Sequence, residues 1–165
     1  MIAVRHFAAA AFILAILAPA MSRAQDYAAI VAAPDRSEAD RQTDQRRQPE
    51  KMLAFAGVKT GMMVLDMEAN AGYSTELFAR AVGPSGVVYA QDPQGIIDRF
   101  VKDKFDNRAT SPAMKNVVHV IRDFDDPIPP EAANLDMITF FFAYHDVTYM
   151  QVDRSEERRV GKECA

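Results

Sequence analysis

The stretch that decides the fold is VLDMEANAGYSTELFARAVGPSGVVYAQD, residues 64–92. It starts within a short apolar run, 62–65, which reads as a buried strand that ends at Asp66. A loop of small residues follows, then a helical pattern over 74–82, and then a second apolar strand that ends at Asp92. Strand, loop, helix and strand at this spacing predict a parallel βαβ unit.

Further elements continue this alternation on both sides. We expect a helix over 49–56, another over 95–105, a third strand over 117–121 and a fourth, strongly apolar strand over 135–142. The strands are continuous apolar runs, which is typical of parallel sheets with helices on both faces. The sequence therefore predicts an α/β fold, a Rossmann-like parallel sheet with helices on both faces that is truncated after its fourth strand.

The two ends of the chain differ from its middle. Residues 1–24 combine a basic start, an apolar run and Ser-Arg-Ala before Gln25, which is the layout of a secretory signal peptide. The run is shorter than the roughly 20 residues that a membrane-spanning helix needs. The end of the chain, RSEERRVGKEC, resembles the translation of a sequencing-library adapter. We expect four segments: a cleaved signal peptide (1–24), a polar helical segment (25–48), an incomplete α/β domain (49–153) and a non-native tail (154–165).

Composition limits the classes of function. The chain has 165 residues, one cysteine and a formal net charge of −4. One cysteine builds neither a disulfide framework nor a cysteine-based zinc site, and no ligand spacing indicates another metal. The acidic balance argues against a nucleic-acid partner, which requires a basic face. Within the polar stretch 35–48 we expect a solvent-facing helix with Arg46 and Arg47 solvated.

The residues at the strand ends suggest a ligand. Loop amides and a helix N-terminus favour a carboxylate or phosphate, and an acid that ends the second strand can accept hydrogen bonds from a ribose diol. A nucleoside-containing cofactor at the carboxyl ends of the strands follows from this pattern. Plainer interpretations remain open: Asp66 as a loop cap, Asp92 as a turn residue, His119 as a packed histidine and His145 as a structural one.

Four strings together, VLDMEANAGYST, GVVYAQDP, VVHVIRDFDDPIP and LDMITFFFAYHD, resemble the class I S-adenosylmethionine-dependent methyltransferases. They are most similar to predicted bacterial methyltransferases that carry a signal peptide. The resemblance implies S-adenosyl-L-methionine as cofactor and a partial methyltransferase domain over 49–153. By position it assigns cofactor contacts to Asp66, Glu68, Gly72, Asp92 (ribose), Asp123 and Phe124 (adenine), and donor and acceptor contacts to His145 and Asp146.

The chain departs from the family at its glycine motif. The usual G-x-G-x-G becomes Glu68-Ala69-Asn70-Ala71-Gly72, so only the third glycine is kept. Side chains at the first two positions hinder close approach of the backbone to a ligand. Glu68 would repel the carboxylate of the cofactor, but it can accept a hydrogen bond from the amino group or lie near the sulfonium.

We expect methyl transfer to an unidentified small-molecule acceptor, with His145 and Asp146 supplying a base where the acceptor holds a proton. No nucleic-acid partner is expected, no stable membrane span after cleavage, and a periplasmic or secreted location. The alternative is an exported methyltransferase-like binding module without catalysis, since the cofactor is made in the cytoplasm. A dinucleotide oxidoreductase ranks last because G-x-G-x-x-G is absent. The chain as given is expected to be inactive, because its fourth strand would be an uncovered edge.

Overall fold

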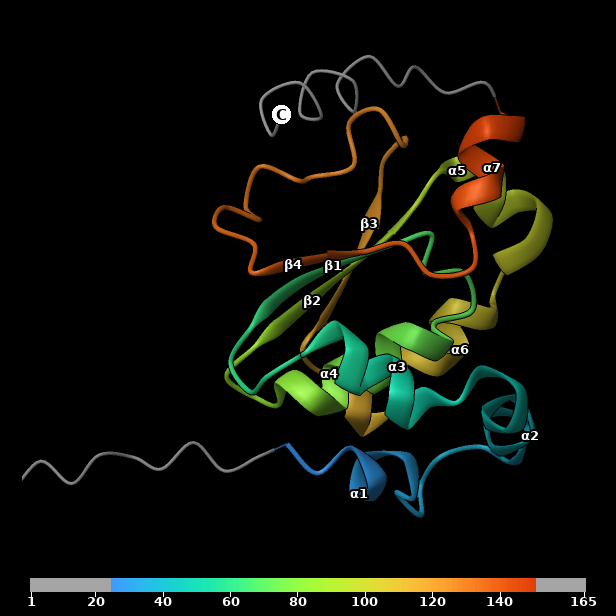
Figure 1. The fold of residues 1–165 in the computed structure, drawn as a ribbon. Helices are drawn as coiled ribbons and strands as arrows, with labels where there is room; N and C mark the ends of the chain where they lie inside the picture. The colour runs from blue at the N-terminus through green and yellow to red at the C-terminus, as the bar shows by residue number, and fades with distance from the viewer. Residues whose placement is uncertain (1–24, 151–165) are drawn as a thin grey trace, which may run out of the picture.

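The structure is a computed structural model, and it describes residues 25–150 (Figure 1). The predicted signal peptide, 1–24, and the predicted non-native tail, 154–165, lie outside the described residues. Between Gln25 and Met150, no helix is both long enough and apolar enough to cross a membrane.

Four parallel strands form one sheet in the order β3-β2-β1-β4. The strands are β1 (Met63–Met67), β2 (Val87–Asp92), β3 (Val117–Ile121) and β4 (Met137–Thr139). From β1 the chain moves outward through β2 to β3, and it then returns to the opposite side of β1. This order confirms the predicted Rossmann-like parallel sheet, and it places a topological switch point between β1 and β4.

Helical segments connect and flank the strands. They are α1 (Tyr27–Val31), α2 (Glu38–Arg47), α3 (Pro49–Ala56), α4 (Tyr73–Val82), α5 (Gln94–Ile96), a π-helix (Ile97–Val101), α6 (Lys104–Ala109), a 3-10 turn (Pro112–Met114) and α7 (Tyr144–Tyr149). Local chemistry sets several of their ends. The Ser37 hydroxyl accepts a hydrogen bond from the Asp40 amide at 3.1 Å and caps α2. Pro49 occupies the first turn of α3, where its missing N–H costs nothing.

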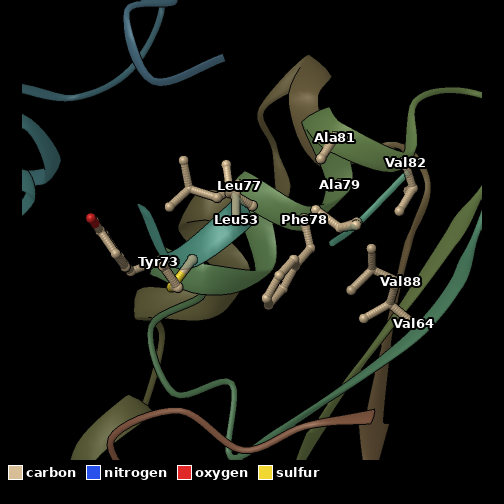
Figure 2. Packing of buried hydrophobic residues seen from close by; sticks show 11 residues of the cluster. Leu53, Val64, Tyr73, Leu77, Phe78, Ala79, Ala81, Val82 and Val88 are labelled. Atoms are coloured by element: carbon tan, nitrogen blue, oxygen red, sulfur yellow. The ribbon is translucent and has the colours of Figure 1, made fainter. Parts of the chain in front are cut away.

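One face of the sheet holds the main core. The buried side chains of α3 and α4 pack onto β1 and β2, with Phe78 and Leu77 at the centre of the cluster (Figure 2). Both are fully buried, and burial of a side chain of this size is worth about 1.5–3 kcal/mol. α1 adds partly buried residues to the same cluster, so the segment before residue 49 is part of the core.

The other face is covered differently. Leu65, Tyr89 and Val120 point to that side and pack against Ala132, within the long connection between β3 and β4. Among the described residues this connection, 122–136, forms no helix. Three prolines at 127, 129 and 130 account for this, because proline lacks the amide that a helix interior requires. Helices therefore lie on one face of the described sheet, and an irregular segment lies on the other.

Two predicted elements differ in extent. The apolar run 135–142 forms a strand only over Met137–Thr139, because Phe142 adopts a left-handed backbone with φ of 66° and the chain leaves the sheet. The helix expected over 95–105 is divided into α5, a π-helix and α6, and it breaks at Lys102, whose φ is 48°. Apolar periodicity did not indicate either local change in the backbone.

The prediction that α2 is a solvent-facing helix is wrong in part. Two of its charged partners are buried: Arg36, just before the helix, and Asp40, within it. Arg36 forms a two-pronged ion pair with Asp44, at 2.6 and 2.9 Å. Asp40 binds Arg108 of α6 in the same manner, at 2.7 and 2.9 Å. The helix docks through ion pairs instead of apolar side chains, so hydrophobic periodicity could not reveal its buried face.

Candidate functional site

A cavity of about 500 Å³ lies where the chain leaves β1 and β4. The loop after β1 (68–71) and the first turn of α4 form one wall, and residues 141–146, which follow β4, form the other. Arg47 of α2 and Phe100 of the π-helix complete the lining. This is the topological switch point, where open parallel sheets bind ligands, and the volume is that of a small-molecule site.

Three residues of the loop after β1 adopt a left-handed backbone, and two of them are not glycine. Glu68 has φ of 52°, Asn70 of 54° and Gly72 of 78°. A left-handed conformation costs an ordinary L-residue about 1–2 kcal/mol. Asn70 offsets part of this cost, because its side-chain amide donates to the Glu68 carbonyl at 3.1 Å. The loop thus retains the backbone course expected of the glycine motif although the sequence departs from it.

Asp66 lies beneath this loop and does not line the cavity. Its carboxylate accepts hydrogen bonds from the hydroxyls of Ser74 (2.9 Å), Thr75 (2.7 Å) and Thr139 (2.9 Å). Burial raises the pKa of Asp66 to about 6, although these three donors oppose the shift. Asp66 therefore ties β1 to α4 and β4, which fixes the two walls of the cavity relative to each other.

Glu68 lines the cavity and is only 7% exposed. One carboxylate oxygen, Oε1, accepts from the Asn70 side chain at 3.3 Å. The other, Oε2, is buried and has no hydrogen-bond partner among residues 25–150. Burial raises the pKa of Glu68 to about 8, and the nearby carboxylates of Asp146 and Asp92 add to the rise. The ionised form of Glu68 is therefore disfavoured by its surroundings, and a cationic group beside it would stabilise the carboxylate.

Asp92 is fully buried and supports the loop from below. Its Oδ1 accepts from the Asn70 backbone amide at 2.9 Å, and its Oδ2 lies 3.3 Å from Nε2 of His119. Burial raises the pKa of Asp92, although His119 and the Asn70 amide oppose the shift. His119 stacks on Phe105 with ring centroids 4.0 Å apart, as the packed-histidine interpretation expects. Asp92 reaches the cavity through the Asn70 backbone, and its own oxygens do not line it.

His145 and Asp146 both line the cavity, opposite Glu68. Nε2 of His145 lies 3.6 Å from Oδ2 of Asp146, and the imidazole is 75% exposed. Asp123 is exposed, and Phe124 is buried against Phe140 with ring centroids 5.5 Å apart. The structure thus brings His145 and Asp146 into the cavity with Glu68, and places Asp123 and Phe124 outside it.

The prediction that Arg47 is solvated is wrong in part, because Arg47 is half-buried against two aromatic rings. Its guanidinium lies 5.0 Å from the ring centroid of Tyr73 and 4.5 Å from that of Phe142, and all three residues line the cavity. The contact joins positions far apart in the sequence, so no local pattern could have indicated it. No group of three or more histidine, cysteine, aspartate or glutamate residues within the described chain is placed to hold a metal ion.

Gly72 closes the loop where there is no room for a side chain. A Cβ atom there would lie 2.9 Å from Cδ of Arg108 and 3.3 Å from the Phe105 ring, and φ is 78°. Gly72→Ala is expected to lower the free energy of unfolding by about 2–3 kcal/mol, from backbone strain and overpacking together. Urea denaturation measures this loss. Gly95→Ala is the control, because nothing lies within 4 Å of its Cβ position, and a loss no larger than in that variant would contradict the prediction.

Comparison with known proteins agrees with this geometry. No protein-family model matches the chain. The ubiquinone/menaquinone biosynthesis C-methyltransferase of Burkholderia multivorans is 32% identical over 111 residues, which cover 67% of this chain and 43% of that protein. The equivalent protein of Cupriavidus taiwanensis is 30% identical over the same shares. A solved S-adenosylmethionine-dependent methyltransferase from Aquifex aeolicus is 28% identical with a TM-score of 0.51, covering 67% of this chain and 58% of that one.

The resemblance to class I methyltransferases is confirmed. The chain spans less than half the length of the curated methyltransferases that it matches. The part that it shares with them includes the strand-loop-helix unit that forms one wall of the cavity. In this methyltransferase fold, the loop 68–72 and the residues 143–146 meet at one cavity because β1 and β4 are neighbours in the sheet.

Proposed function

We propose that the protein transfers a methyl group from S-adenosyl-L-methionine to a small, largely apolar acceptor. The observation that carries the proposal is the cavity at the switch point, which brings the loop after β1 together with His145 and Asp146. The methyltransferase relatives favour this function over the alternative of a binding module without catalysis.

The residues present fit the cofactor in two respects. The loop 68–72 keeps the left-handed turns that let its backbone approach a ligand, and Glu68 offers a buried oxygen without a partner. S-adenosylmethionine, when bound, supplies the methyl group on a positively charged sulfur. The acidic lining of Glu68 and Asp146 suits that charge. Asp92 holds the Asn70 amide below the cavity, so its part in ribose binding, which the family resemblance implies, would act through the loop that it supports.

The other wall suits the acceptor. Phe100, Phe141 and Phe142 line the cavity beside His145, so an aromatic or alkylated acceptor would be packed against aromatic rings. The named relatives act in quinone biosynthesis and methylate carbon. His145 would take the proton of an acceptor hydroxyl or carbon acid, and Asp146 would orient and stabilise the imidazolium. Positioning of acceptor and donor supplies most of the rate gain in such a displacement.

A periplasmic or secreted location belongs to the same proposal. Its support is the basic start, the apolar run and the Ser-Arg-Ala site within residues 1–24. The intact mass of the exported protein is expected to match a chain that begins at Gln25. A mature protein that begins at Met1 would contradict this location.

A transfer assay tests the function. The full-length natural protein is incubated with methyl-labelled S-adenosylmethionine and an alkylated hydroquinone, and the methylated product is quantified by mass spectrometry. We expect product with that protein and at least a 100-fold loss with its His145→Gln variant, the range for removal of a general base. Cofactor binding without any transfer would favour the binding-module alternative, and absence of cofactor binding would exclude both.

Asp92→Asn is expected to weaken S-adenosylmethionine binding by about 1.5–3 kcal/mol, because the Asn70 amide of the binding loop loses its charged acceptor. Isothermal titration calorimetry measures the change, and circular dichroism verifies that the fold is kept. Asp125→Asn is the matched control, since Asp125 is exposed in the neighbouring loop. Equal affinities for wild type and Asp92→Asn would show that the charge of Asp92 does not support the binding loop.

A further inference from the structure

Two cavity residues of opposite charge keep polar atoms that have no partner among residues 25–150. Arg47 lies on the last turn of α2, and Glu68 replaces the first glycine of the loop after β1. The family resemblance assigns a cofactor contact to Glu68 and none to Arg47. Both line the same cavity, whose volume is about 500 Å³.

Arg47 is fixed in place without use of its hydrogen-bond donors. Its guanidinium lies against the rings of Tyr73 and Phe142, at 5.0 and 4.5 Å from their centroids. Within residues 25–150 it makes no hydrogen bond and no ion pair, whereas Arg36 and Arg108 near by are both paired with carboxylates. Stacking on two rings holds a guanidinium by its faces and leaves its N–H edge for a planar anion, which is bidentate in the case of a carboxylate.

Glu68 is the complementary group. Glu68 is only 7% exposed, and its Oε2 has no hydrogen-bond partner among the described residues. Asp146 of α7 and Asp92 of β2 lie close enough to disfavour its ionised form, and no cation within residues 25–150 is hydrogen-bonded to it. A cationic donor group of a ligand would satisfy Oε2 and reduce the repulsion among the three carboxylates.

We propose that Arg47 and Glu68 together bind the α-amino acid head group of the cofactor, Arg47 its carboxylate and Glu68 its ammonium. The inference rests on the proposed function and assigns the charged end of the same ligand. It also accounts for the glutamate in the loop. A lone acidic side chain there would repel the carboxylate of the head group, and Arg47 of α2 supplies the opposite charge. α2 thereby becomes part of the binding site.

Calorimetric titration of the full chain with two ligands tests this assignment. S-adenosylhomocysteine carries the amino acid head group, and 5′-methylthioadenosine lacks it. We expect Arg47→Met and Glu68→Gln each to weaken binding of S-adenosylhomocysteine about tenfold or more, as the loss of a charged hydrogen bond implies. Binding of 5′-methylthioadenosine is expected to change less than about twofold, because that ligand makes neither contact. Arg46→Met is the control, since Arg46 is exposed on the same helix and does not line the cavity.

The outcomes separate this inference from the proposed function. If the wild-type chain binds neither ligand, the proposed function and the inference both fail. If it binds both ligands and the two variants bind S-adenosylhomocysteine as tightly as wild type, only the inference fails. An equal loss for both ligands would also overturn it, because the residues would then support the fold of the site and not recognise the head group.

Discussion

Replacing Arg108 with methionine is expected to lower the free energy of unfolding by about 3–5 kcal/mol, the cost of breaking a buried ion pair from one side. The Arg108 side chain is 19% exposed, and all three nitrogens of its guanidinium donate hydrogen bonds. It donates to both oxygens of Asp40, to Glu76 at 2.6 Å and to the Ala71 carbonyl at 2.6 Å. Without it, Asp40 remains buried with no cation of comparable geometry.

The same substitution is expected to weaken cofactor binding, because the bond to Ala71 holds the loop that lines the cavity. Urea denaturation and calorimetric titration of one preparation measure both effects. Arg122→Met is the control: the Arg122–Asp126 pair is partly exposed, and pairs of that kind contribute about 0–1 kcal/mol. A loss of stability in Arg108→Met no larger than in the control would show that the ion-pair cluster does not hold α2 in place.

The parts of the fold that follow hydrophobic periodicity were predictable. The three strands β1, β2 and β3 and the helix α4 lie within a few residues of where apolar runs and an amphipathic pattern place them. β4 is shorter than its apolar run because Phe142 turns out of the sheet and into the cavity lining. Hydrophobicity does not indicate backbone conformation, and the apolar run here extends past the strand to Phe142, which is 56% exposed.

The site was predictable only in part, and for a related reason. Glu68, His145 and Asp146 lie in the cavity because they directly follow strands that are neighbours in the sheet. Asp66 and Asp92 also end strands, but their carboxylates turn inward and bind hydroxyl groups, an amide and a histidine. Sequence position fixes which end of the sheet a side chain occupies. It does not fix whether the side chain points to the ligand or supports the loop that does.

The place of Arg47 in the cavity could be found only from the three-dimensional structure. α2 has almost no apolar side chains, so its docking depends on charges whose partners lie 29 to 68 positions away along the chain. Its last turn then reaches the cavity between two aromatic rings. A polar helix of this composition would be solvated in isolation. Arg36, Tyr73 and Arg108, which lie outside the helix, bind its carboxylates and give it a buried face.

Glu68→Gln is expected to make the protein more stable than wild type at pH 8.5, by about 2–4 kcal/mol. Folding raises the pKa of Glu68 from 4.5 to about 8, through burial and the neighbouring carboxylates. Between these two values the folded protein holds a proton that the unfolded chain has released, so the free energy of unfolding falls as the pH rises. Each pKa unit corresponds to about 1.4 kcal/mol, and water in the cavity screens part of the full difference. Glutamine does not titrate, and the variant avoids this loss.

Urea denaturation at pH 5 and pH 8.5 measures the effect. At pH 5 the two proteins are expected to differ by less than about 1 kcal/mol, because Glu68 is then neutral in the folded state and glutamine is of similar shape. Asp66, whose pKa is about 6, lowers the stability of both proteins between pH 4 and 6 and cancels in the comparison. Glu131→Gln serves as the control, since Glu131 is exposed. A variant that loses stability with pH as steeply as wild type would show that Glu68 is not the buried acid.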